Sequence, residues 1–356
     1  MMKFQNTAIL SIALVLSACG GGSGGSANSG GATVGANAGT VSGQGCTNKF
    51  GRTWTAVDGV GQKLEYFNNV VYGNGVFLGI GYGKAVISRD GENWVNVTSS
   101  GVHGGYALTY ALGKIYMVGQ AGGLTDKRMM ASSTIDGTSW DNLIIGDSAN
   151  PSLQALPYFD PKSMSYGNGR FILVGGDGKI IWSADGRNWY AAANAADLKV
   201  YVFGWSTFAN GKFYAGAGLN VYVSSDGNTW QTQKIVGDGT FPTTGITGMQ
   251  YFNGMYVAVD SQGNIANSSD GVNWKTVAKG RAFLPVNGNA IVAGGGQLMA
   301  VDLASSFTTD GDYIFYSCDG IQWEKTKVPN GNYSYSIAIG DNIAAGVGNT
   351  PIFSKY

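Results

Sequence analysis

The chain has 356 residues, of which only 12% are charged, and its 22 basic residues balance its 22 acidic ones. This balance excludes the concentrated basic field with which proteins neutralise a nucleic-acid backbone. A single histidine, His103, excludes a metal site built from several imidazoles, and we predict no metal and no cofactor. The 58 glycines and 19 tyrosines favour strands joined by tight turns over helices.

The N-terminus has the features of an export signal. Lys3 precedes an apolar run at residues 8–16, and small residues follow it. The run is too short for a permanent membrane span. Its end, "LSAC" (16–19), resembles the lipobox of bacterial lipoproteins, and the alternative is an ordinary signal peptide. The resemblance implies cleavage after residue 18 and a lipid on Cys19. Because Gly20 follows, it also implies sorting to the outer membrane. The sequence does not predict which side of that membrane the protein faces.

Residues 20–45 contain no charged and no aromatic residue. Such a segment has no apolar surface to bury, so we expect residues 19–45 to be a lipidated cysteine and a disordered tether. Treated as a flexible coil, the tether has a root-mean-square span of about 28 Å. We therefore expect one folded domain at residues 46–356, held near the membrane through Cys19.

A seven-residue pattern, Ser/Thr-x-Asp-Gly-x-x-Trp, occurs six times in the folded part of the chain. The copies lie at 88–94, 134–140, 183–189, 224–230, 268–274 and 317–323. With Trp54, the tryptophans recur at steps of between 40 and 49 residues. A strand-rich period near 45 is typical of propeller blades.

Each unit also carries a hairpin signal upstream of this pattern, such as "YGNGVFLGIG" (72–81). Asn-Gly pairs supply the positive φ angles of a two-residue turn. Seven hairpin signals accompany six complete patterns, because the seventh is split between "FGRTW" (50–54) and "IFSKY" (352–356). The sequence therefore predicts an all-β, seven-bladed propeller of four-stranded antiparallel blades, whose last blade is closed by N- and C-terminal strands.

The pattern resembles the Asp-box, or BNR repeat, of sialidase-like propellers. In that family the boxes lie at the sheet periphery, away from the functional face, so the resemblance implies a structural role. The aspartate accepts backbone N–H groups within its own turn, and the tryptophan fills space between sheets. The residues concerned are Asp90, Asp136, Asp185, Asp226, Asp270, Asp319, Trp54, Trp94, Trp140, Trp189, Trp230, Trp274 and Trp323.

Catalytic candidates are few. Sialidase chemistry needs an arginine cluster, which this chain lacks, as it lacks the Arg-Ile-Pro motif of that family. Other glycosidases need two carboxylates at a set separation, and nothing in the sequence pairs Glu65, Asp126, Asp177, Asp260 or Asp302. Asp310 and Asp312 form an Asp-x-Asp fragment, which by itself is weak support for calcium.

Binding candidates gather in the loops that we expect at one mouth of the ring, where long loops on a rigid scaffold carry function. We select Tyr82, His103, Tyr106, Arg128, Trp205, Arg281 and Tyr333, with Tyr201 among the other aromatic residues of these loops. The resulting hypothesis is a lipid-anchored binding or scaffolding module for a protein or a cell-surface glycan. The alternative is a glycan-active hydrolase or lyase. A third possibility, assembly assistance, follows from resemblance to the photosystem II assembly factor propellers.

The chain has three cysteines. If Cys19 carries a lipid, Cys46 and Cys318 remain as an even pair in an oxidising compartment. We therefore expect a Cys46–Cys318 disulfide that ties the N-terminal segment to the sixth blade.

Overall fold

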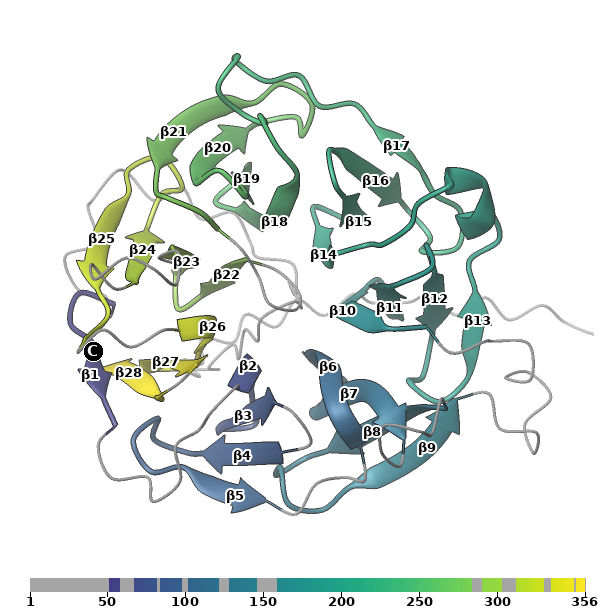
Figure 1. Cartoon of the computed structure of the whole chain (residues 1–356), viewed down its shortest axis with the longest axis vertical. Coiled ribbons are helices and arrows are strands. Elements are labelled where there is room, and N and C mark those ends of the chain that lie inside the picture. Colours follow the sequence, from purple (N-terminus) through teal and green to yellow (C-terminus); the bar gives the residue numbers. More distant parts are fainter. Residues whose placement is uncertain are drawn as a thin grey trace, which may run out of the picture.

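The computed structural model describes residues 51–57, 67–81, 84–97, 102–121, 128–145, 159–283, 290–302, 312–329, 334–348 and 350–355, with the backbone alone given for 102–106, 334 and 335. Seven four-stranded antiparallel sheets form a ring, as Figure 1 shows in a view along its axis. The predicted seven-bladed all-β propeller is thus confirmed. Among the described residues, no helix has both the length and the apolar character needed to cross a membrane.

The blades follow one another along the chain, and each runs from the innermost to the outermost strand. Blades 1 and 2 contain β2 (Phe67–Gly73), β3 (Val76–Gly81), β4 (Lys84–Ser88), β5 (Val95–Val97), then β6 (Val102–Ala111), β7 (Lys114–Ala121), β8 (Met129–Thr134) and β9 (Asp141–Ile145). Blades 3 and 4 contain β10 (Pro161–Gly167), β11 (Arg170–Gly175), β12 (Ile180–Ser183), β13 (Trp189–Ala191), then β14 (Trp205–Ala209), β15 (Lys212–Ala217), β16 (Asn220–Ser224) and β17 (Gln231–Gln233), with the short 3-10 helix η1 (Ala195–Leu198) between them.

Blades 5 and 6 contain β18 (Ile246–Phe252), β19 (Met255–Asp260), β20 (Asn264–Ser268), β21 (Lys275–Lys279), then β22 (Ile291–Gly294), β23 (Gln297–Asp302), β24 (Tyr313–Ser317) and β25 (Glu324–Lys327). Blade 7 joins β26 (Ser334–Ile339), β27 (Ile343–Gly348) and β28 (Ile352–Lys355) to β1 (Thr55–Ala56). In its register, Thr55 lies opposite Phe353 and Ala56 opposite Ile352. The two chain ends therefore close the ring, as the split pattern predicts.

The hairpin between the first and second strands of a blade also links that blade to the next. Asn74 adopts a positive φ of 53° in its Asn-Gly turn, which asparagine tolerates better than most residues. Its side-chain amide donates to the carbonyl oxygens of Gly113, at 2.7 Å, and Ile135, at 3.2 Å. The Tyr110 hydroxyl donates back to the Asn74 amide oxygen at 2.7 Å. One turn residue thus connects the blade 1 hairpin with both turns of blade 2.

These contacts define two faces of the ring. The turn face carries the hairpins between first and second strands and the Asp-Gly turns between third and fourth strands, since strand direction alternates within each blade. The loop face, opposite, carries the segments that join blades and those that join second and third strands.

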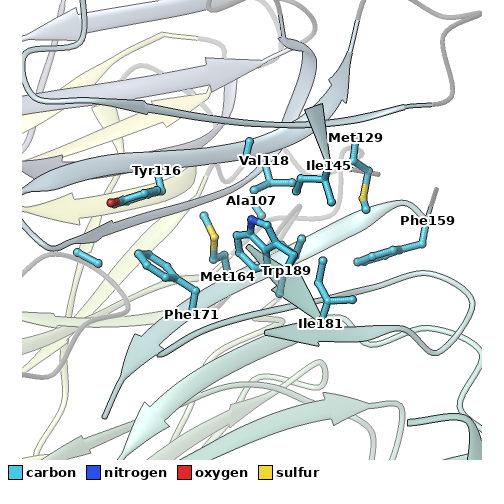
Figure 2. Packing of buried hydrophobic residues seen from close by; sticks show 13 residues of the cluster. Ala107, Tyr116, Val118, Met129, Ile145, Phe159, Met164, Phe171, Ile181 and Trp189 are labelled. Carbon is cyan, nitrogen blue, oxygen red and sulfur yellow. The ribbon is translucent and has the colours of Figure 1, made fainter. Parts of the chain in front are cut away.

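The cores lie between neighbouring blades. Figure 2 shows the cluster between blades 2 and 3, where Trp189 packs with Phe171 and Met164 against Val118. The Phe171 and Trp189 rings lie 6.2 Å apart, and Tyr116 covers Phe171 at 4.6 Å. Because each blade buries a face on both neighbours, every missing blade would expose two such clusters. The ring is therefore a rigid frame for its loops.

Candidate functional site

The repeated aspartates are committed to their own turns. In blade 1, the Asp90 carboxylate accepts the backbone N–H groups of Glu92, at 2.9 Å, and Asn93, at 2.7 Å, and the hydroxyl of Ser88 at 3.1 Å. Burial acts to raise the pKa of Asp90, but these bonds and that from the Asn93 side chain outweigh it and lower the pKa to about 2. A carboxylate with a low pKa has no proton to give as a general acid. Because its lone pairs already accept hydrogen bonds, it is also not available as a general base.

The glycine and tryptophan of each turn serve packing between blades. Gly186 has a φ of 74°, and a Cβ there would lie 2.5 Å from the Tyr116 ring of the preceding blade. The Trp189 indole donates to the Gly186 carbonyl at 3.2 Å. Equivalent indole bonds occur at Trp54, Trp94, Trp230 and Trp274. Within the described residues, the indole N–H groups of Trp140 and Trp323 are buried without a partner.

The loop face is therefore the side to search for binding groups. Four of the selected residues fall outside the description, wholly for Tyr82 and Tyr333 and in their side chains for His103 and Tyr106, so those predictions stay open. The same holds for Glu65, Asp126 and Asp310. Arg128 is exposed at the end of the loop between the second and third strands of blade 2, and its carbonyl accepts the Ala121 N–H at 2.8 Å.

Trp205 requires a correction. Its side chain is only 2% exposed, and its indole donates to the Ile246 carbonyl of blade 5. Gly216, opposite it in the sheet, has no side chain, and a Cβ there would meet the indole at 2.0 Å. The indole therefore fills the junction of blades 4 and 5 and is not available to a ligand.

Arg281 is held on the loop face by a buried acid. Its Nε lies 3.1 Å from the Asp302 carboxylate, which is almost fully buried and also accepts the backbone N–H groups of Arg281, at 2.7 Å, and Ala282, at 2.9 Å. The guanidinium carbon lies 5.1 Å from the Tyr313 ring centre, and the Lys325 ammonium lies 4.6 Å from the same ring. Arg281 is therefore partly exposed but held in one position, and the Asp302 carboxylate is occupied by holding it.

The other carboxylate candidates in the described part of the chain are Asp260, Asp177 and Asp312. Asp260 is buried in the turn after β19, where it accepts the backbone N–H groups of Gln262 and Asn264, both at 2.9 Å. Asp177 is exposed in a loop of blade 3, and Asp312 is buried at the start of blade 6's third strand. No group of three or more His, Cys, Asp or Glu side chains suited to a metal ion occurs in the part of the chain that the structure describes.

Two apolar side chains of the described loop face stand out by exposure. Tyr201 is 84% exposed in the segment that joins blades 3 and 4, and Leu219 is 64% exposed at the tip of the β15–β16 loop. The backbone beneath Tyr201 is fixed, since its carbonyl accepts the Gly178 N–H at 2.9 Å and Phe203 donates to Gly175 at 3.0 Å. Tyr201 therefore projects from a fixed backbone. We call Tyr201 and Leu219 the loop-face pair.

Sequence reasoning included Tyr201 only among many aromatic residues and missed Leu219. The available signal for Leu219 was an apolar residue after glycine in the segment "AGAGLN" (215–220), at a turn position where a polar residue or glycine is the usual choice.

Cys318 is disulfide-bonded in the structure. Both other cysteines of the chain, Cys19 and Cys46, lie outside the described residues. The Cys46–Cys318 pairing therefore stays a prediction.

Comparison with known proteins places the chain by fold. It is similar to YCF48 bound to a D1 peptide, at 18% identity and a TM-score of 0.60, over 87% of this chain and 97% of that one. The WD40 propeller domain of Doa1 matches at 11% identity and a TM-score of 0.61, over 86% and 98%. The GH74 xyloglucanase of Xanthomonas campestris matches at 14% identity and a TM-score of 0.56, over 86% and 53%. No protein-family profile and no curated protein sequence matches the chain.

Proposed function

We propose that this protein is a lipid-anchored binding module of the bacterial outer membrane, held through Cys19, that binds a protein partner with its loop face over blades 3 and 4. The observation that carries the proposal is the loop-face pair, in which Tyr201 is 84% and Leu219 64% exposed. Tyrosine is enriched among residues that dominate interface energies. The exposed Leu219 on the same face adds apolar area that a protein surface can bury.

A protein partner fits these side chains better than a glycan does. Sugar recognition combines an aromatic face with several convergent polar groups, and leucine adds nothing to it. The structural neighbour YCF48 has a bound D1 peptide, which supports peptide binding as a use of this fold. The hydrolase alternative is less well supported, because two of its candidate carboxylates, Asp260 and Asp302, already accept backbone N–H groups.

Site-specific photocrosslinking in cells tests the proposal. A benzophenone amino acid replaces Tyr201 in one variant and Ile321 in another. Ile321 is 48% exposed on an Asp-Gly turn and serves as the matched control on the turn face. We expect a discrete protein adduct from position 201, identified by mass spectrometry, and none from position 321. The same adducts from both positions, or none from 201, would contradict the proposal.

A further inference from the structure

Blade 3 and blade 2 differ in how they fill the rim of their junction with the next blade. In blade 3, the Trp182 indole lies between the Arg170 guanidinium, 4.4 Å from its ring centre, and the Tyr190 ring, at 4.9 Å. Its N–H donates to the Asn228 side chain of blade 4 at 3.2 Å. Arg170 also donates to the Asp226 carbonyl. The rim of the junction of blades 3 and 4 is therefore filled by side chains of the protein itself.

The same three positions in blade 2 carry smaller or charged side chains. Lys114 follows the hairpin turn as Arg170 does, Ser133 precedes the Asp-Gly turn as Trp182 does, and Asp141 pairs with Ser133 as Tyr190 pairs with Trp182. Serine in place of an indole leaves a cleft of ≈ 60 Å³ between blades 2 and 3. About 10–15 Å³ of such space holds one water molecule. The cleft therefore has room for a group of several heavy atoms but not for a sugar ring.

The acceptors at this cleft are already matched. Asp141 is 2.5 Å from the Arg187 guanidinium of blade 3. The Asp185 carboxylate accepts the backbone N–H groups of Arg187 and Asn188, both at 2.8 Å, and the Asn188 side-chain amide at 2.7 Å. Both negative charges thus have partners within the protein.

The donors at the cleft have no such partners. Within the described chain, no described group pairs with the Lys114 ammonium or the Tyr116 hydroxyl. Burial raises the pKa of Tyr116, so its hydroxyl keeps its proton. An ammonium and hydroxyl groups with spare capacity, including Ser133, call for a ligand that is rich in acceptors and negatively charged.

We propose that the cleft between Lys114, Tyr116, Ser133 and Arg187 is a carboxylate site that takes one acidic side chain of a protein ligand. A carboxylate with one or two methylenes matches its volume, and it accepts from the Lys114 ammonium and from the hydroxyl groups at once. Arg187 is exposed and its pair with Asp141 is a surface ion pair, which is weak enough for the guanidinium to share. The site lies on the turn face, so it stands independently of the loop-face pair.

Titration of the ¹⁵N-labelled protein with the blocked peptide acetyl-Gly-Glu-Gly-amide tests the proposal by NMR. We expect saturable shifts of the amides of residues 114, 133 and 187, and none with the Gln peptide. Lys114→Met should weaken the apparent affinity at least tenfold, and Ser133→Trp should abolish the shifts by filling the cleft as in blade 3. Lys212→Met, at the corresponding position of blade 4, is the matched control and should leave the shifts unchanged.

Several outcomes would overturn the proposal. Equal shifts with the Gln peptide would show that the carboxylate is not recognised. Unchanged affinity in Lys114→Met, with an unchanged melting temperature, would remove the ammonium from the site. Tighter binding of acetyl-Gly-Lys-Gly-amide than of the Glu peptide would assign the cleft to cations through Asp141.

Discussion

The backbone N–H of Gly51 donates to the Ser354 hydroxyl at 2.7 Å, although 303 positions separate the two residues. The same bond closes complete turns within one segment, for example from Gly186 to Ser183 at 2.8 Å. The Trp54 indole also donates to the Gly51 carbonyl at 3.0 Å, as the indoles of four other turns donate to their glycines. The seventh turn is therefore assembled from the two ends of the chain, without an aspartate in either half.

Deletion of residues 352–356 should destabilise the propeller strongly. It removes β28, whose Ile352 is fully buried, and leaves β1 and β27 without a partner strand between them. We expect a melting temperature lower by about 10 °C or more. Deletion of residues 20–45, the expected tether, should change it by about 1 °C or less. Equal melting temperatures of the two deletion variants in differential scanning calorimetry would contradict closure of the ring by the chain ends.

Ser354→Ala should cost about 1–3 kcal/mol of unfolding free energy, because it leaves the buried Gly51 N–H without its acceptor. Ser183→Ala is the matched control, since it removes the equivalent bond inside one segment. Urea denaturation measures both. A cost for Ser183→Ala alone would show that the split turn contributes nothing to stability.

Acid should lower the stability of the propeller at a pH below the range in which unperturbed carboxylates take up protons. Burial raises the pKa of Asp185, but bonds from Asn188 and Arg187 outweigh it and lower the pKa to about 2, as at Asp90. A pKa below the unfolded value of about 3.9 stabilises the fold above that value, and the contribution is lost as pH falls toward 2. Melting temperatures should therefore drop between about pH 4 and pH 2.

Asp90→Asn should flatten this acid dependence, because the amide does not titrate. Asp177→Asn, on an exposed loop, is the control substitution and should leave the profile unchanged. An identical pH profile for Asp90→Asn and the parent protein would show that the turn carboxylates do not couple folding to pH.

Peptide mapping without reduction should find Cys318 linked to Cys46. Cys318 is disulfide-bonded, and Cys19 is expected to carry the lipid. The chain-entropy treatment gives an upper figure of about 4–5 kcal/mol for so long a loop. Cys46→Ser should thus lower stability and free one thiol. Two alkylatable thiols in the unreduced mature protein, or a Cys19–Cys318 link, would contradict the pairing.

Cys19→Ala should release the protein from the membrane fraction, because one cysteine carries the whole expected anchor. Inhibition of the lipoprotein signal peptidase should block maturation of the parent protein and leave the substituted one unaffected. Retention of Cys19→Ala in membranes would refute the lipidation proposal.

The fold was predictable from the sequence because each blade repeats local chemistry. Asp-Gly turns and Asn-Gly hairpins depend on residues a few positions apart, so their spacing reveals strand order, and the halves at residues 50–54 and 352–356 reveal the closure. The binding surface was less predictable. Trp205 and Tyr201 are four residues apart and both aromatic, yet one is 2% and the other 84% exposed.

That difference depends on contacts between blades, which no local pattern contains. Trp205 is buried because Gly216 makes room for its indole and Ile246 of blade 5 accepts its N–H. Tyr201 is exposed because its segment is held from below by blade 3. The cleft beside Ser133 is likewise visible only when blade 2 is compared with the filled junction at Trp182.

The binding proposal is tested most directly with the partner protein that photocrosslinking at position 201 identifies. Its affinity is measured for the parent protein and for variants of the loop-face pair. Isothermal titration calorimetry should show that Tyr201→Ala weakens binding by about 2 kcal/mol, or roughly 30-fold, as expected of an interface anchor. Leu219→Ser should weaken it less, and Ile321→Ser, on the turn face, should leave it unchanged. Unchanged affinity for Tyr201→Ala, or an equal loss for Ile321→Ser, would contradict a binding surface on the loop face.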